Sequence, residues 1–553
     1  MSHLPVLKPA GRPVLLGCAI LGVNLLALAE SANIDFSPQV ERWGIEEITL
    51  REARSHANPF TEVNLKCRFM SAGNEVDAEG FYDGATTWKV RFMPPVEGQW
   101  RFETVSNDAE LNGRKGFFLS IAPRTGNHGP VTVRNKYHFA YSDGTPYFPL
   151  GTTLYNWLHR EKELQERTLA TLKNSPFNKV RFCMFPKWYP FNHVEPPLYP
   201  YVKTGENQFD FDRFNPEYFR HIEARLLDLQ ALGIEADIIL FHPYDRWGFA
   251  SMDRIHDDLY LHYVIARLAC FRNVWWTMAN EWDFVRPGKD WDHIFQTVQK
   301  ADPYHHLRAI HNGDVWYDHS KPWVTHCNIQ SQTGDLYSTA LGARLKYGKP
   351  ILVDEYGYEG NNGYMWGTLS AAQAVRRHWE VTMAGGYATH GETYVHPGDV
   401  LWWAVGGELV GESPARLDFL KRIMTEAPYE EMEPLPDAVK GGTALGKRGQ
   451  YYVFYFAQTD RGPAEIKITG DGPLKVDFID PWLMKIYPVG YVRPGVYSFL
   501  PKLVPGLIRI VRCAQVERTV QPHASMNELL REWESGRLGA SRAPAGRIGE
   551  AGR

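Results

Sequence analysis

The chain has 553 residues and a formal net charge of −4 at pH 7, and 44% of its residues are hydrophobic. This length indicates several domains, since a domain typically has about 100–200 residues. No basic stripe stands out, which argues against nucleic acid as the main partner. The six cysteines are scattered and lack metal-like spacing. We therefore expect buried thiols rather than a disulfide framework.

Residues 1–29 have the pattern of a secretory signal peptide. Lys8 and Arg12 precede an apolar run that ends in the small-residue signal Ala27-Leu28-Ala29. The run falls short of the roughly 20 apolar residues of a membrane span, so we expect cleavage and no stable membrane insertion. A lipoprotein site at Cys18 is the alternative. The sequence predicts a secreted or periplasmic protein of a bacterial cell.

Residues 30–123 contain short alternating runs of apolar and polar residues, for example at residues 87–92 and 98–104. Turn-forming pairs such as Asp83-Gly84 and Asn112-Gly113 separate them. Several strands at this spacing predict an Ig-like β-sandwich. No acid–base group of residues occurs here. We expect the sandwich to pack on the next domain, and carbohydrate binding is the alternative role.

Residues 124–427 alternate between strand and helix signals, which predicts βα units and a parallel sheet. One helix shows the pattern well: Asn215 is a natural N-cap, Pro216 suits the first turn, and Gly233 ends the helix. Eight strands in such an arrangement predict a (β/α)8 TIM barrel. The predicted strands are residues 146–151, 178–185, 235–241, 273–282, 307–310, 324–329, 349–357 and 386–389.

Two of these strands end in a carboxylate. An aromatic run closes with Asn280-Glu281, and an apolar run closes with Glu355. Active sites of barrels lie at the carboxyl ends of the strands, and a retaining glycosidase needs two carboxyl groups about 5–5.5 Å apart. We therefore predict that Glu281 and Glu355 form a catalytic pair. Strand alternation puts Glu355 on the face of Val353 and predicts that Asp354 points towards the helices.

Asn280-Glu281 after an aromatic strand, with Glu355 closing a later strand, resembles the pattern of clan A retaining glycoside hydrolases. The resemblance implies that Glu281 is the acid/base and Glu355 the nucleophile. It also implies that Asn280 holds the sugar 2-hydroxyl and that Arg181 steadies the nucleophile.

Three further segments resemble a narrower bacterial architecture: Gly80-Phe-Tyr-Asp-Gly84, Gly126-Asn-His-Gly-Pro130 and Leu240-Phe-His-Pro-Tyr-Asp-Arg-Trp247. In that architecture an N-terminal sandwich precedes an apiosidase-like barrel and a small C-terminal β-domain. The resemblance covers nearly the whole chain after residue 29, but it does not identify the sugar.

Other polar and aromatic residues follow predicted strands and are candidates for substrate binding, with loop-fixing or packing roles as the alternative. Glu392 is also the rival for a catalytic role. The histidines lack the spacing of known metal sites, so we expect no metal and no cofactor. The candidates are His242, Tyr244, His311, Gln330, His390, Glu392 and Trp403.

Residues 428–514 contain alternating runs that predict a small all-β domain, and residues 515–553 form a tail that we expect to be largely disordered apart from a short helix at residues 527–535. The sequence thus predicts a secreted retaining glycoside hydrolase that cleaves O-glycosidic bonds of a polysaccharide or oligosaccharide. We expect the sandwich and the loops after the first, third and eighth strands to narrow one end of the cleft, which favours exo-action at a chain end. A non-catalytic carbohydrate-binding protein on a barrel scaffold and a transglycosylase are the alternatives. The oligomeric state stays open.

Overall fold

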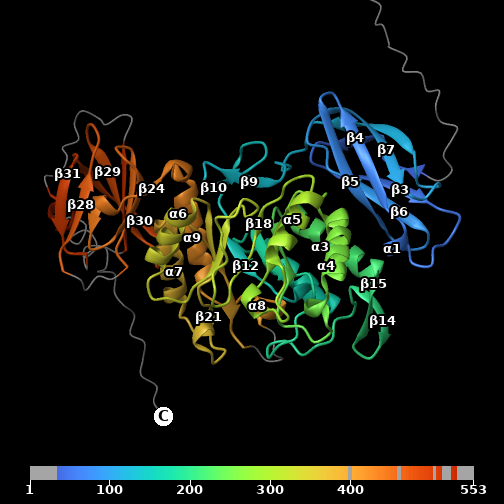
Figure 1. The fold of residues 1–553 in the computed structure, drawn as a ribbon. Helices are drawn as coiled ribbons and strands as arrows, with labels where there is room; N and C mark the ends of the chain where they lie inside the picture. Colours follow the sequence, from blue (N-terminus) through green and yellow to red (C-terminus); the bar gives the residue numbers. More distant parts are fainter. Residues whose placement is uncertain (1–33, 396–400, 458–461, 502–505, 513–524, 532–553) are drawn as a thin grey trace, which may run out of the picture.

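A computed structural model describes residues 34–395, 401–457, 462–501, 506–512 and 525–531 (Figure 1). The predicted signal peptide lies outside the described residues, as does most of the tail, of which residues 526–531 are helical. No helix in the described part is long and apolar enough to cross a membrane. The four described cysteines, Cys67, Cys183, Cys270 and Cys327, are buried free thiols, as predicted.

The N-terminal part is a β-sandwich whose strands follow the order β1-β3-β6-β5-β4-β7-β8-β2. Strand β5 pairs with β4 and, through residues 80–82, with β6, so it joins both halves around a core that contains Phe69 and Trp100. The strands are β1 (Ile34–Asp35), β2 (Gln39–Glu41), β3 (Glu46–Arg51), β4 (Leu65–Ser71), β5 (Asn74–Tyr82), β6 (Thr87–Phe92), β7 (Gly98–Ser106) and β8 (Lys115–Ile121).

The sandwich packs on helices α3 (Pro216–Ala231) and α4 (Arg254–Leu268) through buried ion pairs. Arg91 of the sandwich reaches Glu223 at 2.9 Å, and Arg267 reaches Asp83 at 2.9 Å. Breaking one partner of such a buried pair is strongly destabilising, which favours a fixed placement of the two parts. The short helix α1 (Pro59–Glu62) lies at the same contact.

The central part is a parallel sheet of eight strands in the order β18-β17-β16-β13-β12-β22-β20-β19. Side chains of Thr325 and Asn312 bridge the two end strands: Thr325 accepts from the Arg308 amide at 2.7 Å, and Asn312 accepts from the Gln330 amide at 2.9 Å. These contacts close the ring into the predicted barrel. Its strands are β12 (Gly151–Thr153), β13 (Lys179–Cys183), β16 (Glu235–Phe241), β17 (Val274–Ala279), β18 (Arg308–Ala309), β19 (Cys327–Gln330), β20 (Ile351–Glu355) and β22 (Tyr387–His390).

Helices cover the outside of the barrel (Figure 1). As predicted, the side chain of Asn215 caps α3 by accepting from the Glu217 amide, and Pro216 occupies its first turn. The other helices are α2 (Lys162–Lys173), α5 (Trp291–Ala301), α6 (Leu336–Tyr347), α7 (Ala371–Met383), α8 (Trp402–Val405) and α9 (Ser413–Thr425). Two short ladders lie at the strand ends, β14 (Tyr201–Gly205) with β15 (Gln208–Phe214) and β21 (Glu359–Gly360) with β23 (Glu392–Thr393).

A small sheet closes one end of the barrel: β9 (Val131–Arg134), β10 (His138–Tyr141) and β11 (Pro146–Tyr147). Phe139 packs on Trp275 inside the barrel, with ring centroids 5.2 Å apart. The prediction of a first barrel strand at residues 146–151 is therefore wrong. Residues 146–147 belong to the plug, and the barrel strand begins only at Gly151, because both segments are apolar and periodicity does not separate them.

The C-terminal part has two sheets, in the orders β24-β26-β27-β32-β29-β30 and β25-β28-β31. Tyr451, Val453 and Leu507 pack against Leu417 and Leu420 of α9, on the flank of the barrel away from the sandwich (Figure 1). The strands are β24 (Glu433–Pro434), β25 (Val439–Lys440), β26 (Thr443–Lys447), β27 (Tyr451–Tyr455), β28 (Ala464–Ile468), β29 (Leu474–Asp480), β30 (Lys485–Val492), β31 (Gly495–Phe499) and β32 (Leu507–Arg512).

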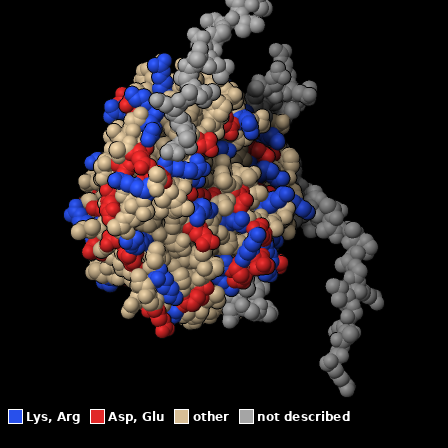
Figure 2. All heavy atoms as spheres, turned by 90° about the vertical axis from the view of Figure 1, so that its right-hand side faces the viewer, with Lys and Arg blue, Asp and Glu red and all other residues tan. Residues whose placement is uncertain are grey.

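Positive and negative side chains are interspersed on the face shown in Figure 2. In the sandwich, some charges pair across strands, for example Arg68 with Asp77 at 3.0 Å and Lys66 with Glu79 at 3.4 Å. Exposed pairs of this kind contribute little to stability, about 0–1 kcal/mol each.

Candidate active site

A cavity of about 200 Å³ opens at the carboxyl ends of the barrel strands, opposite the plug formed by β9 to β11. Segments at the carboxyl ends of seven strands, β12, β13, β16, β17, β19, β20 and β22, contribute to its wall, and no described residue of the sandwich does. Both Glu281 and Glu355 line it. Its aromatic residues are Tyr155, Tyr189, Phe191, Tyr244, Tyr358, Tyr364, Trp366 and Trp403.

Glu281 follows β17 directly and has left-handed backbone angles, φ 49° and ψ 54°. A residue with a Cβ atom pays about 1–2 kcal/mol for this conformation. This turn brings the side chains of the consecutive residues Asn280 and Glu281 together. Asn280 donates from Nδ2 to Glu281 Oε2 at 2.7 Å. Strained backbone of this kind persists where the surrounding packing holds it, and it is common at active sites.

Glu355 ends β20, and the predicted face of this strand is wrong. Val353 packs with Ala340 and Val381 on the helix side, whereas Asp354 accepts from Lys179 inside the barrel at 3.2 Å. The ladder with β19 shifts register at this point, so that Gln330 lies opposite Glu355. A bulge breaks the strict alternation of side chains along the strand. Asp354 and Glu355 therefore both contact side chains inside the barrel, Lys179 and Arg181.

A hydrogen-bond network joins the two carboxylates. Arg181 donates from Nη1 to Glu355 Oε1 at 3.0 Å and from Nη2 to Asn280 Oδ1. The Tyr155 hydroxyl accepts from Arg181 at 2.9 Å and donates to Glu355 Oε1. The network therefore fixes the position of the Glu355 carboxylate and links it to Asn280, the neighbour of Glu281.

Glu281 has a different environment. Burial raises its pKa from 4.5 to about 7, and the negative charge of Glu355 adds to the rise. Lys187, Tyr244 and Arg181 lower the pKa but do not cancel the effect of burial. At neutral pH, Glu281 is therefore poised to give and to take a proton. A carboxyl group with a raised pKa next to one that accepts from an arginine matches a division of the pair into two different roles.

Of the other predicted substrate-binding residues, Tyr244, Gln330 and Trp403 line the cavity. His311 lies just behind Glu355, with Nε2 at 3.7 Å from Oε1. Burial and the positive charges of Arg181, Lys187 and Lys179 keep the pKa of His311 well below 6.5. It therefore lies beside Glu355 as a neutral ring.

Six predicted substrate-binding residues are not on the cavity wall. Asn280, Arg181 and His311 lie beside the two carboxylates, whereas the other three have structural surroundings. His242 binds the Phe185 carbonyl at 3.1 Å and accepts from the Tyr244 amide, so it fixes the loop after β16. His390 stacks on Phe177, with ring centroids 4.8 Å apart. Both residues lie at or just after a strand end, but their side chains do not face the cavity. The sequence alone does not reveal this direction.

Glu392 is the third of these residues, and the sequence also made it the rival for a catalytic role. It lies outside the cavity. Its two carboxylate oxygens accept from the amides of Val410 and Gly411 at 2.8 and 2.9 Å. Glu359 beside it accepts from the amides of Glu412 and Ser413. The two carboxylates thus hold the loop that continues from Trp403, which explains their burial without contact to a substrate.

The sequence interpretation missed Tyr155 and Lys187. Tyr155 follows the true first strand, and the misplaced strand hid its position. Lys187 follows β13 in Phe185-Pro-Lys-Trp, and a polar residue directly after a barrel strand was the available signal. Both line the cavity.

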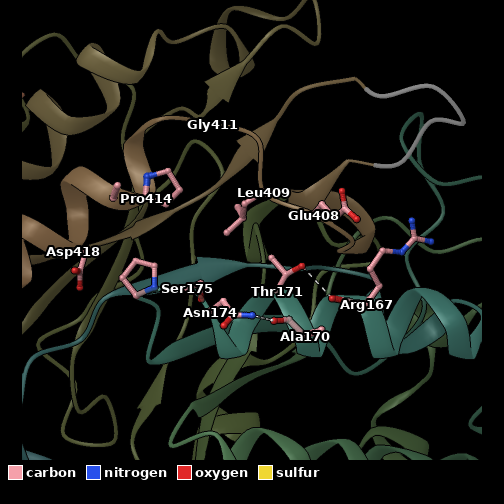
Figure 3. Close-up of a pocket in the computed structure, with 12 residues that line it drawn as sticks. Arg167, Ala170, Thr171, Asn174, Ser175, Glu408, Leu409, Gly411, Pro414 and Asp418 are labelled. Carbon is pink, nitrogen blue, oxygen red and sulfur yellow. Dashed lines mark hydrogen bonds between the residues drawn. The ribbon is translucent and has the colours of Figure 1, made fainter.

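A larger hollow of about 810 Å³ lies outside the barrel, between α2 and the segment that leads into α9 (Figure 3). Thr171 and Asn174 of α2 bond within their own helix, to the carbonyls of Arg167 and Ala170. The acidic residues Glu408 and Asp418 stand apart on its wall, which carries no aromatic side chain. The smaller cavity is therefore the candidate active site, because it combines, unlike this hollow, two carboxyl groups and aromatic rings at the carboxyl ends of the barrel strands.

Comparisons with known proteins agree with this choice. Residues 133–416 match the family described as "Apiosidase-like, catalytic domain", and residues 39–107 match a domain of unknown function, DUF5060. A comparison with curated proteins gave no match.

Solved structures give the same result. A candidate glycoside hydrolase from Bacteroides vulgatus ATCC 8482 is 36% identical, with a TM-score of 0.80 over 86% of this chain and 100% of its own. A family 5 glycoside hydrolase from the same organism is 16% identical, with a TM-score of 0.56 over 74% of this chain and 98% of its own, and shares the fold. The barrel, its cavity and these matches together show that the chain is a glycoside hydrolase of the apiosidase-like family.

Proposed function

We propose that the protein is a retaining glycosidase that acts by double displacement, with Glu355 as nucleophile and Glu281 as acid/base. The observation that carries the proposal is that both carboxyl groups line one cavity, where Glu355 accepts from Arg181 and burial raises the pKa of Glu281 to about 7. Retention requires this pairing of one ionised and one protonated group.

In the first step, a carboxylate oxygen of Glu355 attacks the anomeric carbon while Glu281 gives its proton to the departing oxygen. The contacts from Arg181 and Tyr155 both fall on Oε1, so we assign the attack to Oε2. Formation of the glycosyl ester removes the negative charge of Glu355. Since that charge raises the pKa of Glu281, its loss lowers the pKa and suits Glu281 to accept a proton from water in the second step.

The cavity supports action on a single sugar unit at a chain end. Its volume of about 200 Å³ is small beside the roughly 300–1,000 Å³ of typical ligand pockets. Tyr189, Phe191 and Trp366 stand around it and offer flat apolar faces for a sugar ring. We propose a polysaccharide or oligosaccharide as the substrate. Early release of mid-length oligomers would contradict action at a chain end.

The mechanism is tested on a panel of nitrophenyl glycosides and cell-wall glycans with four proteins: wild type, Glu355→Ala, Glu281→Ala and Glu408→Gln. The last removes an acidic side chain outside the cavity and serves as the control. We expect turnover by wild type and control, none by Glu355→Ala, and partial rescue of Glu281→Ala by azide. Undiminished turnover by Glu355→Ala would refute the assignment, and binding without turnover in every variant would favour a carbohydrate-binding protein.

We also propose that the protein is exported, on the basis of the apolar run that ends at Ala29. The boundaries near residues 124 and 428 stay predictions. Mass spectrometry of the mature protein from a bacterial host gives its first residue. An intact N-terminus in the cytoplasmic fraction would contradict export.

A further inference from the structure

Lys187 is a buried cation on the wall of the cavity. It is 2% exposed and follows the carboxyl end of β13. Its backbone is fixed on both sides, because Asn156 accepts from its amide at 2.7 Å and donates to its carbonyl at 2.6 Å, and Asn192 donates to the same carbonyl at 3.0 Å. The fold therefore holds this lysine in place.

The ammonium group is surrounded by aromatic rings. Nζ lies 3.7 Å from the ring centroid of Tyr155, 4.1 Å from that of Tyr244 and 4.5 Å from that of Tyr189. Ring faces attract a cation but accept hydrogen bonds only weakly. The three rings form an aromatic cage that attracts the ammonium. They do not supply the oxygen acceptors that its three N–H donors require.

Lys187 also lacks the ion pairs that its neighbours have. Lys179 lies 2.7 Å from Asp237, and Arg181 lies 3.0 Å from Glu355. Across the described ranges of the chain, no carboxylate lies within 4.0 Å of the Lys187 ammonium, and no hydrogen bond from Nζ is found. Burial lowers the pKa of Lys187, because a buried charge without a close partner is costly, and an anionic group of a ligand beside the ammonium would offset that cost.

We propose that Lys187 is a substrate-binding residue and that the sugar unit in the cavity is acidic, with a carboxylate or sulfate group that pairs with the ammonium. This inference rests on the proposed function, since it describes the substrate of the same site. Both acceptors would receive a charge-assisted hydrogen bond from the ammonium, but only an anionic oxygen adds a negative charge in direct contact with it, and in a site with little water that attraction is strong. A sugar hydroxyl brings no negative charge.

The test compares substrates that differ only in their acidic groups. Oligosaccharides from alginate and from polygalacturonate are used native and carboxyl-reduced, and those from a sulfated galactan are used native and desulfated. Binding is measured by calorimetry with the Glu355→Ala variant, and turnover is measured with the wild type. Lys187→Met removes the charge at similar length, Lys187→Arg keeps it, and Lys162→Met removes an exposed positive charge as the control.

We expect at least one acidic oligosaccharide to bind ~10-fold or more tightly than its neutral counterpart. Lys187→Met in the Glu355→Ala background should abolish this preference, Lys187→Arg should retain part of it, and Lys162→Met should leave it unchanged. The identity of the preferred pair separates carboxylate from sulfate.

Equal or tighter binding of every neutral member, or an equal loss for both members in Lys187→Met, would overturn the proposal and assign Lys187 to a hydroxyl or to packing. The proposed function fails separately: Lys187-dependent binding of an acidic oligosaccharide that the wild type does not cleave would reject hydrolysis and keep the recognition. Cleavage of the neutral members alone would support hydrolysis and reject the proposed recognition of an acidic sugar.

Discussion

Replacing Glu281 by Gln should stabilise the protein at neutral and alkaline pH while abolishing its activity. Burial raises the pKa of this carboxyl from 4.5 to about 7, so ionisation in the folded state is disfavoured. A shift of that size corresponds to at most about 3 kcal/mol, at about 1.4 kcal/mol per pKa unit. Gln keeps the oxygen that accepts from Asn280 but never carries the charge.

The sign of the effect follows from the direction of the pKa shift. Below about pH 4.5 Glu281 is protonated in both the folded and the unfolded chain, and the wild type and the variant should be equally stable. Between about pH 4.5 and 7 the wild type loses stability, because only the unfolded chain releases the proton freely. Above about pH 7 the difference should stay constant.

Calorimetric unfolding of both proteins from pH 4 to pH 9 measures this difference. A free-energy gain of about 3 kcal/mol corresponds to a rise in Tm of roughly 6–12 °C for a domain of 150–250 residues, and less for a larger one. The difference between the two proteins should vanish at the acidic end of the range. A variant with the same Tm as the wild type at every pH would refute the argument from burial.

Four further outcomes are expected. The kcat/KM of the wild type should fall above about pH 7, where Glu281 loses the proton that it must donate, and a flat profile up to pH 9 would count against its role as acid. Glu355→Gln should lower the free energy of unfolding by about 3 kcal/mol in urea titrations, because Arg181 loses its counter-charge, and unchanged stability would show that the pair is not coupled. Tyr155→Phe should lower kcat about 10- to 100-fold with little change in KM, since it removes a donor to the nucleophile; an effect confined to KM would instead indicate a contact with substrate. Glu392→Ala should cost about 2 kcal/mol by leaving two loop amides unpaired, while Glu392→Gln should cost less, and a loss of catalysis without a loss of stability would return this residue to the list of substrate ligands.

Features with a local cause were predicted well from the sequence. The helix that begins at Pro216 depends on the cap at Asn215, and both are neighbours in the chain. Positions at the carboxyl ends of strands were also accessible, because an apolar run that stops at a polar residue marks such an end. Glu281 and Glu355 are both of this kind, and the cavity contains both.

Features that depend on pairing between distant segments were not predicted. The predicted faces of Val353 and Asp354 were wrong, because the register shift beside Gln330 is a property of two strands, not of one. Lys187 was missed because its cage is assembled from loops after three different strands, including those of Tyr155 and Tyr244. His390 and Glu392 were overvalued for the matching reason, since a position after a strand does not fix the direction of its side chain.

The sequence by itself therefore determined the barrel, its flanking sandwich and the two carboxylates, because each follows from a short local pattern of apolar and polar residues. Only the tertiary structure decided which side chains face the cavity and which hold its loops. The physical reason is that direction and charge state depend on neighbours that are remote in the chain, such as Arg181 for Glu355 and the surrounding burial for Glu281.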